Sequence, residues 1–265
     1  MQVGASLEFR SKSETFESHF RYLTSDLLFM ERNQRFSRAR GFVDVIANAW
    51  LIGLADIPPG VVRIRSGENW IPLEGRRGLI VPPFSVLEWK VAPAEVRWFA
   101  YCSGETLFGV TPPFGLFSWE GSLPRSAEDL REMVLRSQIE PLIPQKRPSA
   151  VAARLKAALD LHYTEEAKIQ RIGGALGYSR ATLHREFSAA YGISPVSYRH
   201  RLRVFEATHL ISNGSSITEA CREVGYSDPG RFAQYFKRYL GMKPSEVSPR
   251  RTGAIRDLRD PPITV

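Results

Sequence analysis

Hydrophobic residues are spaced in two different ways along the chain. Up to about Trp119, short runs of Val, Ile, Leu, Phe and Trp are interrupted by Pro-Pro and Gly, as in ANAWLIGLADIPPGVVRIRS (47–66) and GRRGLIVPPFSVLEWKV (75–91). Such runs are typical of short strands joined by turns. From about residue 149 onward, apolar residues recur at helical spacing. The sequence therefore predicts an N-terminal part that is mainly β, a small barrel or sandwich, followed by an all-α part.

One strand of the β part shows clear alternation. In VVRIRS (61–66), Val62 and Ile64 are predicted to face one side of the sheet, and Arg63 and Arg65 the other. Together with four tryptophans, this arginine face predicts a cavity lined by aromatic side chains and a few polar groups. Small-molecule sites usually have this composition. The tryptophans are Trp50, Trp70, Trp89 and Trp98.

A flanking helix is predicted over RSAEDLREMVLRSQI (125–139). Its apolar stripe consists of Leu130, Met133 and Val134 with Ile139. Two roles remain open for this stripe, because it could pack on the chain's own barrel or form the seam of a homodimer.

A linker separates the two parts. EPLIPQKRPSA (140–150) places three prolines and a basic pair where neither a regular helix nor a central strand fits. Residues 1–145 carry 16 Lys and Arg against 17 Asp and Glu, whereas 146–265 carry 20 against 11. This asymmetry indicates a nucleic-acid-binding domain attached to a domain with another role. We predict a sensing or oligomerisation domain at 1–140, a linker at 141–148, a DNA-binding domain at 149–250 and a disordered tail at 251–265.

The basic half contains one motif twice. GGALGYSRATLHREF (173–187) and CREVGYSDPGRFAQYF (221–236) share a small residue, an apolar residue, Gly-Tyr-Ser and a helix that ends in Phe. In each unit the glycine permits a tight or left-handed turn, and a Ser or Asp can cap the following helix. The pattern predicts two helix-turn-helix units.

A long helix is predicted to join the two units. It begins at Ser194 and Pro195, ends at Asn213-Gly214, and is followed by SITE (216–219), which reads as a capping box. Three arginines along it are expected to lie in solvent or against DNA phosphates: Arg199, Arg201 and Arg203.

Helical geometry separates buried from outward positions in each second helix. Leu183 and Phe187 form a buried pair in the first unit, as do Phe232 and Phe236 in the second. Asp228 is the expected N-cap and Pro229 the first helical residue.

These residues resemble the DNA-binding domain of the AraC/XylS family of bacterial transcription regulators, from about Ser149 to Val247. The resemblance rests on the paired units, the linking helix and the endings Phe187…Gly192-Ile-Ser-Pro195 and Phe236…Gly241-Met-Lys-Pro244. It implies two helix-turn-helix units joined by a long helix, with base-reading residues at Ala181, His184, Arg185, Gly230, Arg231 and Gln234. The first half is similar, more loosely, to the family's regulatory barrel, which is cupin-like in many members.

The match departs from the family pattern in three places. Gly173-Gly174 stands where the family favours alanine, PSEVSPR (244–250) lacks an aromatic-Arg ending, and Pro229-Gly230 offers few donors to bases. We therefore expect the first unit to carry more specificity and the second more backbone contact.

The resemblance also implies partners: promoter or operator DNA, RNA polymerase, a small-molecule effector and a second copy of the chain. Whether the protein activates or represses stays open. With no long apolar span and no signal peptide, a bacterial cytoplasmic location is expected, with association with the nucleoid when bound to DNA.

Enzymatic function is disfavoured, and no cofactor, metal or catalytic residue is predicted. Cys102 and Cys221 form no ligand pair, and His19 is the first half's single histidine. An alternative is a DNA-modifying or alkyl-accepting enzyme with an attached helix-turn-helix domain, which would need a reactive cysteine or metal cluster. A cupin-type enzyme is the second alternative.

Overall fold

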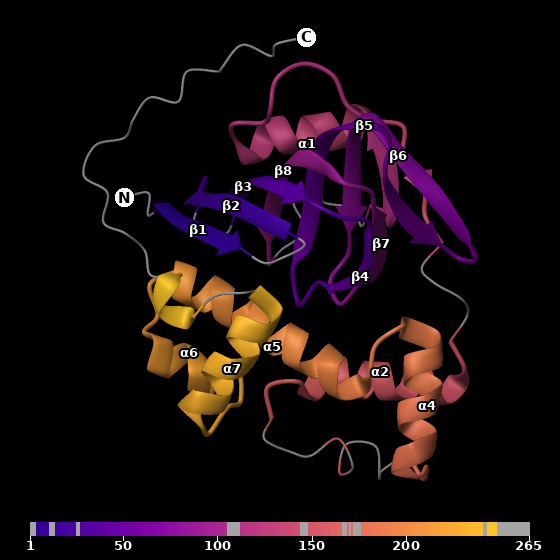
Figure 1. Ribbon diagram of the computed structural model, residues 1–265, viewed down its shortest axis with the longest axis vertical. Helices are drawn as coiled ribbons and strands as arrows, with labels where there is room; N and C mark the ends of the chain where they lie inside the picture. Colours follow the sequence, from indigo (N-terminus) through magenta and orange to yellow (C-terminus); the bar gives the residue numbers. More distant parts are fainter. Residues whose placement is uncertain are drawn as a thin grey trace.

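The computed structural model describes residues 4–10, 14–24, 27–104, 112–143, 148–165, 169, 171, 176–240 and 243–247. A sheet domain, β1 to β10 with α1, sits above a helical domain, α2 to η1 (Figure 1). The prediction of a mainly β N-terminal part and a helical C-terminal part is confirmed. The expected tail at 251–265 lies outside the described residues, and the domain bounds given above stay predictions.

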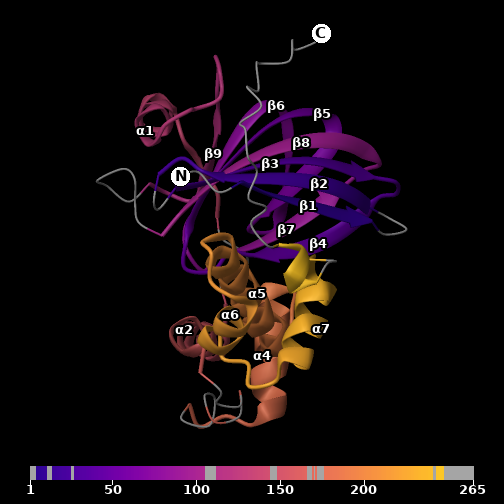
Figure 2. The same cartoon turned by 90° about the vertical axis from the view of Figure 1, so that its left-hand side faces the viewer.

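Strands of the sheet domain follow the order β1-β2-β3-β8-β5-β6-β9-β10, and β4 joins through β7, which pairs with β5. The sheet curls over on itself (Figure 2). The strands are β1 (Gly4–Arg10), β2 (Glu14–Tyr22), β3 (Leu27–Phe36), β4 (Arg40–Val45), β5 (Trp50–Ser66), β6 (Asn69–Val81), β7 (Val86–Val91), β8 (Ala94–Ser103), β9 (Gly115–Ser118) and β10 (Glu140–Pro141).

The long strand β5 holds the curled sheet together. Its first half pairs with β8 and its second half with β7, while β6 runs beside both halves with a register shift between Ile57 and Val62. Val62 and Ile64 are fully buried and Arg63 is exposed, so the predicted alternation is confirmed. In the first half of β5 both faces are buried, and alternation places Trp50, Ile52 and Leu54 in one core and Ala55 and Ile57 in another.

Helix α1 (Ala127–Arg136) covers one of these cores. Leu130 and Val134 are buried there against Trp50 and Phe117, with Met133 packed beside them. Of the two roles left open by the sequence, the structure shows packing of the stripe on the chain's own sheet.

The helical domain contains one long helix, α5, which contacts α2, α4, α6 and α7. Its elements are α2 (Ala150–His162), α4 (Arg180–Tyr191), α5 (Pro195–Ser212), α6 (Ile217–Glu223), α7 (Pro229–Leu240) and the short 3-10 helix η1 (Pro244–Glu246). Ser194 caps α5, which has Pro195 in its first turn, and Ser216 and Glu219 form the expected capping box of α6. Gly173 and Gly174, which depart from the family pattern, lie outside the described residues.

The two domains pack closely against each other. Val45 and Ala47 of the sheet domain belong to the hydrophobic core around α2, α4 and α5, and Phe16 and Phe20 pack on the core around α6 and α7. Phe84 has a positive φ of 58°, and its ring meets that of Tyr163 edge-on at 6.2 Å. A bulky residue rarely adopts positive φ. The packing around Phe84 therefore holds its backbone in this conformation.

Candidate DNA-binding surface and ligand cavity

Both Gly-Tyr-Ser turns have the backbone that the sequence predicts. Gly177 and Gly225 adopt φ values of 75° and 82°, a conformation that side chains disfavour. Ser179 then caps α4 by accepting from the Thr182 N–H at 3.2 Å, and Asp228 accepts from the Gly230 N–H at 2.8 Å at the start of α7. Local chemistry thus positions both recognition helices, α4 and α7.

On α4, the apolar pair Leu183 and Phe187 is buried, while Ala181 and Arg185 are exposed and His184 is partly exposed. Arg185 donates to the neighbouring Glu186 carboxylate at 3.0 Å. An exposed pair of this kind contributes at most about 1 kcal/mol, so it leaves the guanidinium available to another acceptor.

Arg180, which the sequence did not single out, belongs to the same surface. It is exposed at the first position of α4, one helical turn before His184. Burial, helped by the positive charge of Arg180, lowers the pKa of His184. A neutral imidazole at pH 7 can both donate to and accept from a base edge.

On α7, Phe232 and Phe236 are buried, while Gly230, Arg231 and Gln234 are exposed. The N-terminal turns of α4 and α7 both point away from the sheet domain (Figures 1 and 2). Residues near the start of a recognition helix are those that reach base edges in helix-turn-helix proteins. The six predicted reading positions therefore lie on accessible parts of two helices that the sheet domain does not cover.

The expectation that the arginines of α5 lie in solvent or against phosphates is wrong for Arg199 and Arg203, and Arg201 is half-buried and lines the cavity described below. Arg199 and Arg203 are buried, at 7% and 5% exposure, and donate from Nε to the Tyr163 carbonyl; Arg203 also donates to the Glu165 carbonyl. They hold the segment after α2 against α5 instead of meeting solvent or phosphate. Their spacing could not reveal this, because their acceptors lie 36 or more residues away.

His200 lies inside an aromatic stack of the second unit. Its ring lies 3.5 Å from that of Tyr235, and Nδ1 is 2.6 Å from the Tyr226 hydroxyl. Burial lowers the pKa of His200 to about 4, and nearby arginines, Arg203 first among them, act in the same direction.

This burial predicts a pH-dependent contribution to stability. Because the unfolded chain takes up a proton near pH 6.5 and the folded His200 only near pH 4, the free energy of unfolding should fall as pH drops through this window. In His200→Gln this contribution to the fall in the free energy of unfolding should be missing. Above about pH 7 the free energy of unfolding should depend on pH in the same way in both proteins. Urea denaturation across pH measures the difference, and parallel curves for the two proteins would contradict it.

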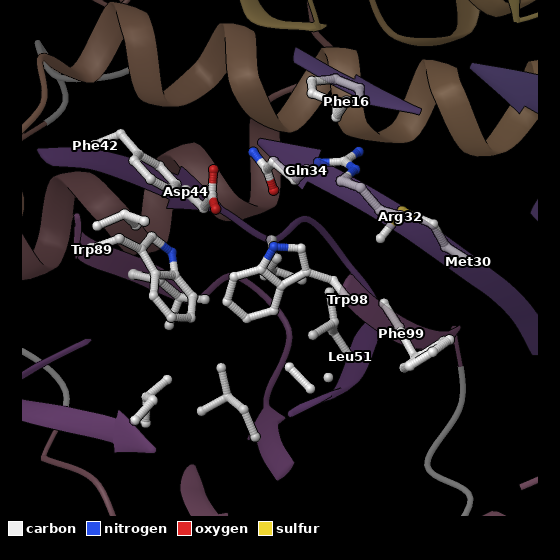
Figure 3. A pocket seen from close by; sticks show the side chains of 18 of the residues that line it. Phe16, Met30, Arg32, Gln34, Phe42, Asp44, Leu51, Trp89, Trp98 and Phe99 are labelled. Atoms are coloured by element: carbon white, nitrogen blue, oxygen red, sulfur yellow. The ribbon is translucent and has the colours of Figure 1, made fainter. Parts of the chain in front are cut away.

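A cavity of about 380 Å³ lies inside the sheet domain, next to the helical domain. It is lined mainly by aliphatic and aromatic side chains, and its polar groups gather at one end around Arg32, Gln34 and Asp44 (Figure 3). The volume and lining are those of a small-molecule site. Only part of the predicted lining is correct: Trp89 and Trp98 line the cavity, whereas Trp50, Trp70, Arg63 and Arg65 do not.

The charged groups at the polar end are desolvated. Burial lowers the pKa of Arg32, which donates from Nε to the Ser18 hydroxyl at 2.8 Å and lies over the Phe16 ring. Burial raises the pKa of Asp44, and the positive charges of Arg201 and Arg32 oppose that rise. Glu14 accepts from both Gln34 and Arg40. Acidic and basic groups of the cavity wall are thus held in place by one another.

Within the described ranges, no group of three or more His, Cys, Asp and Glu residues could hold a metal ion. Burial raises the pKa of the Cys102 thiol to about 12, which keeps it unreactive. His19 is half-exposed beside Glu17. Among the helices described, none is both long and apolar enough to cross a membrane.

Comparison with known proteins identifies the helical domain. A family model described as a helix-turn-helix domain matches residues 152–250. The HTH-type transcriptional activator RhaS of Enterobacter sp. (strain 638) is 29% identical over 104 residues, 39% of this chain and 37% of that protein. RhaS of Escherichia coli O1:K1 is also 29% identical, over 103 residues. The helical domain is therefore a helix-turn-helix domain similar to that of these transcriptional activators.

The similarity to these relatives covers little more than a third of their length, 37%. The C-terminal domain of AraT from Geobacillus stearothermophilus is 26% identical with a TM-score of 0.37, and covers 43% of this chain and 95% of that one. ToxT from Vibrio cholerae, in a structure with bound unsaturated fatty acid, is 11% identical with a TM-score of 0.50, covering 84% of this chain and 95% of that one. At this identity, the likeness to ToxT shows a shared fold over most of both chains.

Proposed function

We propose that the protein is a sequence-specific DNA-binding transcription regulator, and that a small molecule in the sheet domain controls its binding to DNA. The observation that carries this proposal is the pair of capped recognition helices, each with exposed positions at its start. Arg185 and Arg231 are suited to guanine, while Gln234 and neutral His184 can read other base edges.

Several finer features belong to the same proposal. The relatives named as transcriptional activators favour activation, with RNA polymerase as partner. We infer a cytoplasmic protein, without catalysis, that forms a homodimer through a surface other than the buried stripe of α1. The cavity and the shared fold with a ligand-bound protein favour an effector site, and a cupin-like origin of the sheet domain fits its curled sheet.

Arg185→Ala should lower affinity for the preferred site by about 1–3 kcal/mol and relax the preference at one base pair, since a bidentate contact to guanine is worth that much. Arg154, exposed on α2, provides the matched control. Arg154→Ala removes the same charge from the domain and should leave the ratio of specific to random binding unchanged. Fluorescence anisotropy with a site selected from random DNA, and with random DNA itself, measures the affinity and the ratio of specific to random binding at several salt concentrations.

Equal losses on selected and random DNA for Arg185→Ala would remove its role as a base reader. Salt-independent binding by the whole protein would overturn the proposed function itself, because phosphate contacts release counterions and make affinity fall with salt.

A further inference from the structure

The two helix-turn-helix units meet the sheet domain in different ways. In the first unit, the turn after α4 lies outside the cavity, where a Cβ on Gly192 would be 2.8 Å from the Glu88 carboxylate oxygen. In the second unit, the last residues of α7 form part of the cavity wall: Arg238, Tyr239 and Leu240. Figure 2 shows this end of α7 directly under β4. A molecule in the cavity would therefore touch the second recognition helix but not the first.

Three buried donors at the cavity have no hydrogen-bond partner within the described chain: Trp89 Nε1, Trp98 Nε1 and Arg201 Nε. Trp89 acts on the Asp44 carboxyl, whose pKa it lowers. That leaves two donors without an acceptor, Trp98 Nε1 of β8 and Arg201 Nε of α5, one from each domain. Both residues line the cavity. A buried N–H without an acceptor costs free energy, so two at one cavity point to an acceptor group that a bound molecule supplies.

Charge at the polar end favours the same kind of group. The Asp44 carboxylate attracts both Arg201 and Arg32. Arg32 is also attracted by Glu14, which is paired with Arg40. Asp44 lies on β4 and Arg201 on α5, so their attraction crosses the domain border. An acceptor on the bound molecule would compete with Asp44 for Arg201.

We propose that the cavity binds a mostly apolar molecule whose acceptor group lies between Trp98 and Arg201, and that occupancy acts on DNA binding through the second helix-turn-helix unit. This rests on the function proposed above. The molecule replaces Asp44 as the partner of Arg201 and packs its apolar body against the end of α7. The position of α7 relative to α4 then depends on whether the cavity is filled. The ligand makes different contacts in the two arrangements of the domains, and this difference lets it shift the equilibrium between them.

Two dyes with the same rings test the acceptor. The full-length protein is titrated with 1-anilinonaphthalene-8-sulfonate and with N-phenyl-1-naphthylamine, which lacks the sulfonate. The sulfonate dye should bind about tenfold more tightly, and Arg201→Gln should abolish that preference. Trp98→Phe should reduce it by about threefold, because Phe fills the site without donating. Arg222→Gln, on the exposed side of α6, is the matched control and should keep the preference.

A second variant tests the cavity without touching a charge. Gly53 lines it on the same strand face as Leu51 and Ala55, and a Cβ there would meet only ordinary contacts, 3.7 Å from Leu51 and 4.0 Å from Leu79. Gly53→Val should therefore fold, as checked by circular dichroism, and lose both dyes. A folded Gly53→Val that binds both dyes normally, or a sulfonate preference that survives Arg201→Gln, would overturn the proposed site.

Hydrogen exchange tests the route to DNA. With the sulfonate dye bound to the full-length protein, amides in the last turn of α7 should exchange severalfold more slowly, while those of α4 stay unchanged. Equal protection of both helices, or of neither, would overturn coupling through the second unit. These readouts need no DNA, so they remain decisive even if the salt and base-preference measurements reject the proposed regulator.

Discussion

Gly225→Ala is expected to destabilise the protein by about 3–5 kcal/mol, far more than the same change at Gly177. Both glycines have positive φ, which costs alanine about 1–2 kcal/mol. At Gly225 a Cβ would also lie 2.6 Å from the Thr164 carbonyl carbon and 2.8 Å from Nη2 of Arg203. Displacing Arg203 would weaken buried, charge-assisted hydrogen bonds worth about 1.5–3 kcal/mol each.

Gly177 supplies the matched control for this prediction. A Cβ there meets no atom within 4 Å, so Gly177→Ala should cost only the backbone term, about 1–2 kcal/mol. Guanidinium denaturation measures the loss of stability in each variant. If the free energy of unfolding falls with denaturant at the same slope in all proteins, a shift of the midpoint reports stability alone. Equal midpoints for the two variants would mean that the segment around Thr164 does not constrain Gly225.

Features set by neighbours in sequence were predictable. The turn glycines, the caps at Ser194 and Ser216, and the buried pair Phe232 and Phe236 each depend on a few adjacent residues, and all are found as expected. Helix starts and tight turns are local problems, because their hydrogen bonds close within about four residues.

Features set by distant contacts were not predictable. Arg203 occupies a position that reads as exposed, yet its acceptors come from the segment after α2. The prediction of the cavity lining was partly wrong for a similar reason. Trp50 and Gly53 are three residues apart on β5 and so face opposite sides, and only the folded sheet shows which side encloses the cavity.

The sequence also could not show that the cavity of the sheet domain reaches α7. The outward positions of α7 follow from helical periodicity, but Tyr239 and Leu240 become cavity wall only because β4 lies above them. One helix thus contributes to two surfaces, with exposed positions at its first turn and cavity wall at its last.

Inserting about 5 base pairs between the two DNA segments contacted by one chain should abolish specific binding. Helix α5 spans 18 residues, about 27 Å at 1.5 Å per residue, and joins both units without a break. One chain is therefore expected to reach two successive major-groove segments on one face, about 34 Å apart. Half a turn moves the second segment to the opposite face, where α7 cannot follow.

An insertion of a full turn, about 10 base pairs, separates this rigid arrangement from two chains that each read one segment. It restores the face of the duplex but doubles the distance to about 68 Å, beyond the reach of α5. Specific binding should therefore stay lost with both insertions, leaving only the affinity seen on random DNA. Footprinting and anisotropy on the three spacings provide the measurement. Recovery at the full turn would show that the two segments belong to different chains, and that α5 does not set the spacing.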